Sequence, residues 1–312
     1  MSAGLVGGLA AVAQTGNRDG AAVESPAGRP VPKLTKRTAY IAAYDTESPR
    51  CLAAVRKIVE VHQRFNFPAT FFMVGRTLEG APEEYRRLLD DPLFEIASHT
   101  YSHRLLREHP LNNDKGPRPD LRKEIFESKA TIERTFQRPC LGIRSAWGFA
   151  HGLTGARDVL TLIAEAGYKY SSSQLWGPDY TLPALLTEPY TYLADGHPTI
   201  WEFPGHGWHE NILKSPTKWG AKRLTLWPAP MPEAIPSTFL KTPDEEFALN
   251  RVFLDKAATG TQSYVSFIWH PWSLGAFDPS MRMLEQTFAY VQKLAMKPTT
   301  FARFYEQAAR AG

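Results

Sequence analysis

The sequence predicts an α/β fold, and within that class a barrel of the (β/α) type. From residue 38 onward, short β-rich runs alternate with amphipathic helical stretches. This alternation is typical of parallel strands joined by helical crossovers, in a barrel or in a doubly wound sheet. Because the chain offers seven such strands with helical crossovers between them, the barrel is favoured.

The expected strands are short and largely apolar, and they cover residues 38–44, 69–74, 94–97, 141–144, 168–172, 199–203 and 264–269. The expected helices carry apolar residues at helical spacing and cover residues 52–65, 121–136, 158–166, 247–258 and 281–294. Residues 205–243 are rich in Pro and Trp and have weak periodicity, so we expect a long excursion that forms a rim or lid beside the site.

Composition limits the classes of function. A chain of 312 residues with 43% hydrophobic and 22% charged residues suits one large globular domain, expected over residues 37–312. The net charge of +4 comes without a dense Lys/Arg run, which favours a solvated basic surface over a nucleic-acid partner. No apolar run approaches the ~18 residues that a membrane span needs.

The first 36 residues are expected to be a signal-like or disordered segment and linker. Residues 3–13 are small and apolar, and Ala11-Val12-Ala13 fits an A-x-A cleavage pattern. The pattern resembles the tail of a twin-arginine signal whose basic start would lie upstream of Met1, and it favours export to the periplasm or the outside of the cell. The alternative is the N-terminal tail of a cytoplasmic protein.

The two cysteines, Cys51 and Cys140, do not form a zinc-finger spacing. In an exported protein they could pair as a disulfide, and two buried free thiols are the alternative.

Polar groups follow four of the expected strands, where a (β/α) barrel gathers its active site. The first strand is followed by Asp45-Thr46-Glu47, the third by His99-Thr100-Tyr101-Ser102-His103, and the seventh by His270. The fourth ends at Arg144. His99 and His103 are four residues apart, so on a helical turn their imidazoles would share one face and bind one metal ion. Asp45 or Glu47 could supply a carboxylate ligand.

Such a set of groups suits amide hydrolysis. A divalent metal lowers the pKa of its water and polarises the carbonyl, a carboxylate accepts the water proton, and a separate histidine protonates the departing nitrogen. Asp45 and His270 are available for the last two tasks. The competing interpretations are structural: Asp45 as a helix N-cap, a task that Ser48 could equally perform, and His270 packed beneath Trp269 and Trp272.

Three motifs resemble the NodB-homology polysaccharide deacetylases: Phe67-Pro68-Ala69-Thr70-Phe71-Phe72-Met73-Val74-Gly75, the His99 to His103 run, and Ile268-Trp269-His270-Pro271. The resemblance implies a distorted (β/α)7 barrel and a hydrolase that releases acetate from an N-acetylated carbohydrate. It also implies roles for individual residues. Asp45 would be the base, His99 and His103 metal ligands, and His270 the acid. Arg144 would hold the base, and the backbone N–H of Trp147 would bind the oxyanion.

The sequence departs from the usual family pattern at two motifs. Asp45-Thr46-Glu47 replaces two adjacent aspartates and resembles a divergent branch that includes peptidoglycan deacetylase-like proteins, which implies Glu47 as third ligand. Arg144-Ser145-Ala146-Trp147 lacks the usual proline. The aspartate that orients the acid histidine has no clear match, and Glu202 or Asp179 are the expected substitutes. Zinc is the expected ion, with cobalt or nickel able to replace it.

Aromatic residues near the strand ends are expected to stack on sugar rings, and Trp208 and Trp272 are the predicted substrate-binding residues. About half of the tryptophans should instead belong to the core. His206 and His209 are expected to line a loop, and extra metal ligands or substrate contacts are the alternative. Two rival functions remain: hydrolysis of small cyclic amides or ureides, as in allantoinase-type barrels, and glycan binding without catalysis.

Overall fold

The computed structural model describes residues 37–112, 120–214, 225–226 and 231–311. The signal-like segment predicted over residues 1–36 lies outside these described residues. None of the helices in the described ranges combines the length and the apolar character that crossing a bilayer requires. Cys51 and Cys140 are both buried free thiols.

Seven stretches of parallel strand lie where the sequence predicts them. They are β1 (Ala39–Thr46), β2 (Ala69–Met73), β3 (Phe94–Ser98), β4 (Gly142–Ile143), β5 (Tyr170–Ser171), β8 (His197–Glu202) and β11 (Tyr264–Ile268). The structure adds strands that the sequence did not predict: β6 (Thr181–Leu182), β7 (Tyr190–Tyr192), β9 (His206–His209), β10 (Thr225–Leu226) and β12 (Lys297–Pro298).

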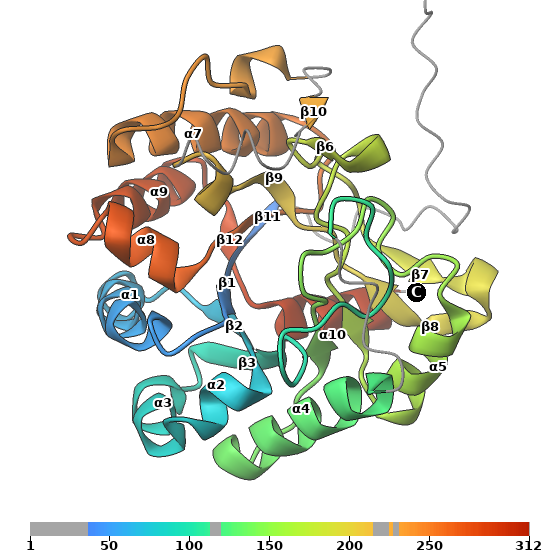
Figure 1. The fold of residues 1–312 in the computed structure, drawn as a ribbon. Helices are drawn as coiled ribbons and strands as arrows, with labels where there is room; N and C mark the ends of the chain where they lie inside the picture. Colours follow the sequence, from blue (N-terminus) through green and yellow to red (C-terminus); the bar gives the residue numbers. More distant parts are fainter. Residues whose placement is uncertain (1–36, 113–119, 215–224, 227–230, 312) are drawn as a thin grey trace, which may run out of the picture.

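The main sheet curls because two strands that are consecutive in the chain, β8 and β9, pair with strands near its opposite ends. The strand order is β7-β8-β5-β4-β3-β2-β1-β11-β9, and β12 also pairs with β1. β8 pairs with β5, and β9, three residues later, pairs with β11, both in parallel. β7 is antiparallel to β8. The result is the predicted distorted (β/α) barrel, with its helices arranged around the curled sheet (Figure 1).

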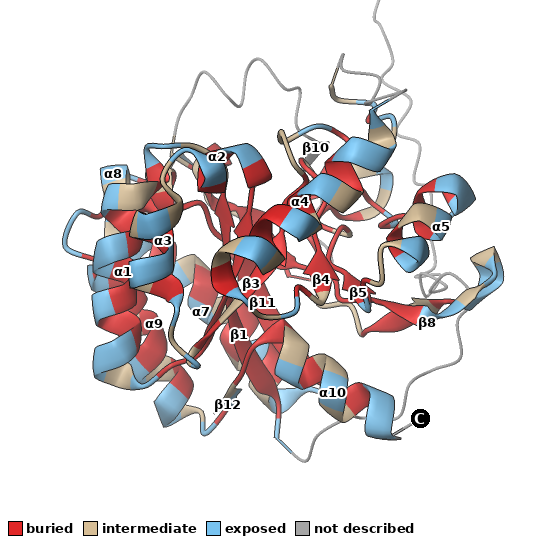
Figure 2. Ribbon diagram, turned by 90° about the horizontal axis from the view of Figure 1, so that it is seen from below, coloured by how far each residue is buried: buried red, intermediate tan, exposed pale blue. Residues whose placement is uncertain are grey.

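The helices cover the outside of the sheet and expose only their outer faces (Figure 2). They are α1 (Cys51–Phe65), α2 (Gly75–Glu79), α3 (Pro82–Leu89), α4 (Leu121–Phe136), α5 (Arg157–Glu165), α7 (Pro243–Thr259), α8 (Pro271–Phe277), α9 (Arg282–Lys293) and α10 (Phe301–Ala311). α7 begins with a capping box in which Thr242 and Glu245 satisfy each other's backbone N–H groups.

Alternation along β1 determines which side chains reach the barrel interior. Tyr40 and Tyr44 belong to the cluster packed beneath the helices, whereas Ala39, Ile41 and Ala43 belong to the interior cluster. Since side chains two residues apart lie on the same face of a strand, Asp45 continues the interior row. The strand therefore brings a carboxylate into the barrel above an apolar floor.

Helix α10 supplies much of that floor. Phe301 and Phe304 belong to the interior cluster, and the ring of Phe301 lies 5.8 Å from that of Phe72 and 5.9 Å from that of Phe203. The helix N-terminus is bound by Glu95, whose Oε2 accepts the backbone N–H of Ala302 at 2.8 Å. The end of the barrel opposite the strand C-termini is thus filled by aromatic side chains.

We expect Phe301→Ala to lower the free energy of unfolding by about 3–5 kcal/mol, because it leaves a cavity among fully buried rings. Urea denaturation followed by circular dichroism measures the change. Arg310→Ala, on the exposed side of the same helix, should change the stability by no more than about 0.5 kcal/mol. Equal stabilities for the two variants would contradict the role assigned to α10.

Candidate metal centre and active site

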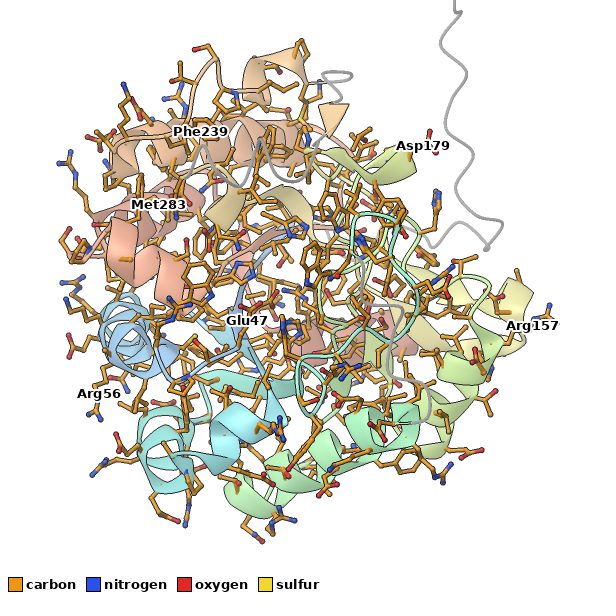
Figure 3. The ribbon with its side chains drawn as sticks, viewed as in Figure 1. Glu47, Arg56, Arg157, Asp179, Phe239 and Met283 are labelled. Carbon is orange, nitrogen blue, oxygen red and sulfur yellow. The ribbon has the colours of Figure 1, made fainter. Side chains whose placement is uncertain are left out.

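The polar residues predicted at the strand ends come together at one mouth of the barrel. Asp45 lies at the end of β1, His99 directly follows β3, Arg144 directly follows β4, and His270 follows β11. Glu47 lies near the centre of the view in Figure 3, which looks into this mouth. The rule that parallel strands bring their C-terminal ends to one mouth of a barrel therefore predicted correctly that these residues lie together.

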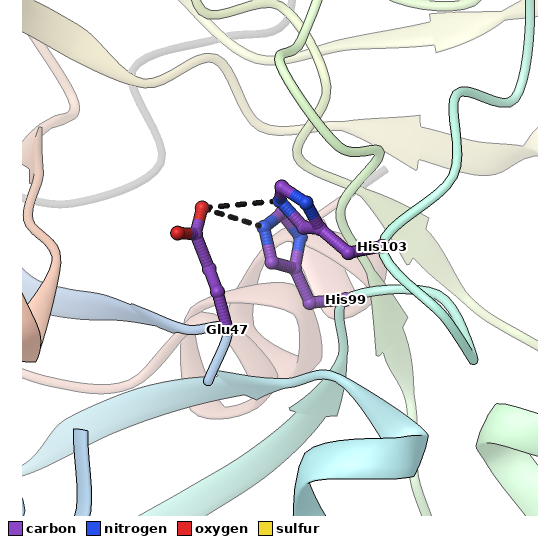
Figure 4. A group of neighbouring side chains, drawn as sticks. All are labelled: Glu47, His99 and His103. Atoms are coloured by element: carbon purple, nitrogen blue, oxygen red, sulfur yellow. Dashed lines mark ion pairs between the residues drawn. The ribbon is translucent and has the colours of Figure 1, made fainter. Parts of the chain in front are cut away.

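Glu47, His99 and His103 form a compact cluster. One ligand atom from each lies within 4.8 Å of the others. Glu47 Oε1 is 3.1 Å from His103 Nε2 and 3.8 Å from His99 Nε2, and the three side chains point toward a common centre (Figure 4). Two imidazoles and one carboxylate leave coordination positions open for water or substrate.

The backbone between the two histidines is not the helical turn that the sequence predicted. Residues 99–103 form an irregular bend in which Thr100 (φ 64°) and His103 (φ 61°) are left-handed. The two rings nevertheless lie close together, with centroids 4.9 Å apart. The spacing of four residues thus gave the right pair of side chains for the wrong backbone reason.

Hydrogen bonding leaves the right atoms available for a cation. His99 Nδ1 lies 3.0 Å from the carbonyl oxygen of Arg144, so this nitrogen carries the proton and Nε2 keeps its lone pair. The Nε2 atoms of His99 and His103 are both buried, and both face the carboxylate of Glu47 without a regular hydrogen bond. Buried polar atoms normally have partners, and a bound divalent ion would satisfy both of them. The donor set therefore fits a metal.

Asp45 and Arg144 form a buried ion pair beside the cluster. Arg144 Nη1 donates to Asp45 Oδ1 at 2.7 Å, and its remaining groups donate to the carbonyl and the hydroxyl of Ser172. Burial alone would raise the pKa of Asp45, but the charges of Arg144, His99 and His270 outweigh it and lower that pKa. Asp45 Oδ2 is 3.9 Å from His99 Nε2, on the side of the metal cluster.

His270 is held by a carboxylate that the sequence analysis missed. Its backbone N–H donates to Glu210 Oε1 at 2.6 Å, and its Nδ1 lies 3.2 Å from the same oxygen. Its Nε2 lies 3.2 Å from Glu47 Oε1. Burial alone would lower the pKa of His270, but Glu47 and Glu210 raise it well above its usual value. The side chain therefore favours its protonated form.

The two carboxylates predicted to orient His270 are elsewhere. Glu202 Oε1 accepts the backbone N–H groups of Ser173 and Gln174, and the other oxygen of Glu202 accepts the hydroxyl of Tyr192. Asp179 is exposed and lies at the periphery in Figure 3. Both predictions are wrong. The usable signal is an acidic residue directly after β9, but the weak periodicity of residues 205–243 does not reveal that strand.

Comparison with known proteins agrees with the motifs. Residues 34–171 match the family model described as polysaccharide deacetylase. This part of the chain belongs to the polysaccharide deacetylase family. The family is one of hydrolases that act on carbon–nitrogen bonds other than peptide bonds, as the sequence predicted.

Solved structures share the fold at low sequence identity. A chain described as a polysaccharide deacetylase from Mycobacterium smegmatis superposes with a TM-score of 0.62 at 19% identity, covering 88% of this chain and 92% of the other. One so described from Pseudomonas aeruginosa PAO1 gives 0.60 at 15% identity, covering 88% and 90%. Puue allantoinase gives 0.58 at 14% identity, covering 86% and 89%. These likenesses establish the barrel.

The site opens on a cavity of about 300 Å³. Its polar lining includes Asp45, Glu47, His103, His209, Asn211 and His270, and its apolar lining is Trp147, Leu175, Trp176 and Ile212. The segment that follows β9 thus forms one wall, as the rim prediction expected. Residues 215–224 and 227–230 of the predicted excursion lie outside the described residues.

The tryptophans near the site have different surroundings: some line the cavity and others are buried in the core. Trp147 has a left-handed backbone (φ 66°), and its carbonyl accepts the indole N–H of Trp176 at 2.7 Å, which fixes the ring of Trp176. Both residues line the cavity. Trp208 is only 3% exposed, belongs to the core, and donates its indole N–H to the carbonyl of Ala234. The prediction that Trp208 binds substrate is therefore wrong.

Trp272 lies beside the candidate metal cluster. It does not line the cavity, and its indole N–H donates to Glu47 Oε2 at 3.0 Å. This hydrogen bond orients the candidate metal ligand, and contact between Trp272 and substrate stays a prediction. Of the two histidines expected in a loop, His206 is buried in β9 and its Nε2 bonds to the carbonyl of Thr187, whereas His209 lines the cavity.

Proposed function

We propose that this protein hydrolyses an N-acetyl group on a carbohydrate or peptidoglycan-type glycan, releases acetate, and depends on a divalent metal held by Glu47, His99 and His103. One observation carries the proposal. Three ligand atoms within 4.8 Å of one another lie beside a cavity that Asp45 and His270 also line. A metal site, a base and an acid at one cavity are what metal-assisted amide hydrolysis needs.

The proposed ligands suit zinc, and cobalt or nickel could replace it, because two imidazoles and a carboxylate accommodate all three ions. When bound, the ion would lower the pKa of water and polarise the acyl carbonyl. The chain's own groups hold the ligands in place. The Arg144 carbonyl fixes the tautomer of His99, and the Trp272 indole fixes the carboxylate of Glu47.

Asp45 is the proposed general base. Arg144 occupies Oδ1 and keeps the carboxylate ionised, so Oδ2 is the oxygen that accepts a proton from the attacking water. As that proton moves, the water oxygen forms its bond to the acyl carbon. The backbone N–H of Trp147, in the wall of the same cavity, is the proposed donor to the oxygen of the tetrahedral intermediate.

His270 is the proposed general acid. Glu210 binds Nδ1, which leaves the Nε2–H for the nitrogen of the departing amine. Transfer of that proton lets the carbon–nitrogen bond break without expelling an amide anion. Acetate and a free amino group on the sugar are the products, and the histidine regains its proton before the next turnover.

The direct test is acetate release from N-acetylated chitooligosaccharides and peptidoglycan fragments. We expect the chelator-treated protein to be inactive and zinc, cobalt or nickel to restore turnover. Released acetate is quantified with a coupled enzymatic assay, and the new amine with a fluorogenic reagent. Bound metal without acetate release from any acetylated glycan would refute the proposed activity and would favour the glycan-binding alternative.

A second candidate is hydrolysis of a small cyclic amide or ureide. The cavity of about 300 Å³ is at the lower end of the range for ligand pockets, so it suits a compact ring as well as one acetylated sugar unit. Parallel assays with hydantoin and allantoin separate the candidates, because each ring-opening consumes substrate without releasing acetate.

A further inference from the structure

Three buried charged side chains, Glu210, Lys214 and Glu246, follow one another in contact beyond His270. Glu210, which holds the histidine through Oε1, uses Oε2 to accept the hydroxyl of Ser273 at 2.8 Å, and Lys214 Nζ lies 3.2 Å from the same oxygen. The ammonium also lies 3.0 Å from Glu246 Oε2. The side chains of Glu210, Lys214 and Glu246 are 3%, 8% and 1% exposed. None of the last three residues was singled out by its sequence pattern.

The ammonium group of Lys214 compensates the negative charges of the two buried carboxylates. Within the described part of the chain, no other lysine or arginine pairs with Glu210 or Glu246. A buried carboxylate without a partner is costly, so one ammonium between two carboxylates stabilises both. Burial would lower the pKa of Lys214, but the two carboxylates outweigh it and raise that pKa, so the ammonium stays charged.

The contacts restrict the orientation of Glu210. Each of its oxygens has two partners: the N–H and Nδ1 of His270 on one side, and Ser273 and Lys214 on the other. The carboxylate plane therefore cannot turn without breaking contacts at both ends. Lys214 is itself held, by Glu246 and by the ring of Phe277, whose centroid is 4.6 Å from Nζ.

We propose that Lys214 and Glu246 are positioning residues for His270, acting through Glu210, so that the imidazole presents Nε2 to the leaving nitrogen. The inference rests on the proposed function, because the leaving nitrogen belongs to the proposed deacetylation reaction. Neither Lys214 nor Glu246 lines the cavity, so both would act on the reaction only through Glu210 and His270.

The test compares two substrates that differ in their need for an acid. The amine of an N-acetylated chitooligosaccharide must be protonated to leave, whereas the nitrophenolate of 4-nitrophenyl acetate leaves without protonation. With zinc present, we expect Lys214→Met to lower kcat for the glycan about 10- to 100-fold, the usual cost of losing a group that orients a functional side chain. KM, and turnover of the ester, should stay within about twofold. Lys214→Arg should restore most of the loss.

Two further variants separate positioning from folding. Lys129→Met removes another partly buried lysine, paired with Glu133 at 3.0 Å on α4, and should leave the ratio of glycan to ester turnover unchanged. Lys214→Met/Glu246→Gln removes both partners of the pair, so no uncompensated Glu246 charge remains if the single variant fails to fold. The double variant should show the same selective loss.

A measurement without substrate separates this inference from the proposed function. The Nδ1–H proton of His270, bonded to Glu210, should give a downfield ¹H NMR signal that His270→Asn abolishes. We expect this signal to broaden or vanish in Lys214→Met and in Lys214→Met/Glu246→Gln. It should persist in Lys129→Met. If the signal is lost but the wild type deacetylates no glycan, the positioning role stands and the proposed function fails. An unchanged signal, or an unchanged ratio of glycan to ester turnover, in the double variant would overturn the inference.

Discussion

Asp45→Asn should lower kcat for deacetylation by about 10²–10⁴-fold, the range for loss of a general acid or base, while leaving the bound metal in place. Asparagine keeps an oxygen that can accept the hydrogen bond from Arg144, now 2.7 Å from Oδ1, but it cannot take a proton from water. The measurements are acetate release and metal content per chain. A variant with near-normal turnover would show that another group is the base.

The choice of asparagine follows from burial. Asp45→Ala should also abolish turnover, but it leaves the guanidinium of Arg144, which is fully buried, without its carboxylate. Removing one partner of such a pair costs about 3–5 kcal/mol of stability. Thermal unfolding of the two variants distinguishes a loss of chemistry from a loss of fold, since only the alanine variant should unfold at a clearly lower temperature.

His99→Ala should release the metal. It removes one of three protein ligands, so we expect affinity for zinc to fall by at least about 100-fold, since the loss of an outer partner alone costs 10–100-fold. Competition with a chromophoric chelator measures the change. His197→Ala, which affects a half-buried histidine beside Thr161 and outside the cluster, should bind zinc like the wild type. Equal affinities for the two variants would exclude the proposed ligand set.

The positions of Asp45, His99, Arg144 and His270 could be predicted because they depend on a general rule. Each lies at the C-terminal end of an apolar run, and parallel strands bring those ends to one mouth of a barrel. The bend between His99 and His103 could not be predicted in the same way. Spacing alone does not reveal that Thr100 adopts a left-handed backbone, and a helical turn accounts for the pair equally well.

Glu210 and Trp208 show where sequence patterns stop being informative. β9 is four residues long, His-Gly-Trp-His, without clear alternation of apolar and polar residues, so neither the strand nor the acidic residue after it was recognised. Trp208 lies in that same strand, and an aromatic residue in an unassigned segment can equally be core or binding surface. Both errors come from one missed strand, which closes the curled sheet against β11.

The aromatic floor supplied by α10 has a consequence for biosynthesis. Phe301 and Phe304 pack beneath β1, and β12 pairs with that same strand, so segments near opposite ends of the described chain complete one another. During translation the early strands leave the ribosome well before α10 does. Until α10 is made, their inward-facing apolar side chains lack the rings that cover them in the folded protein. The nascent chain therefore exposes these apolar side chains to aggregation until α10 emerges.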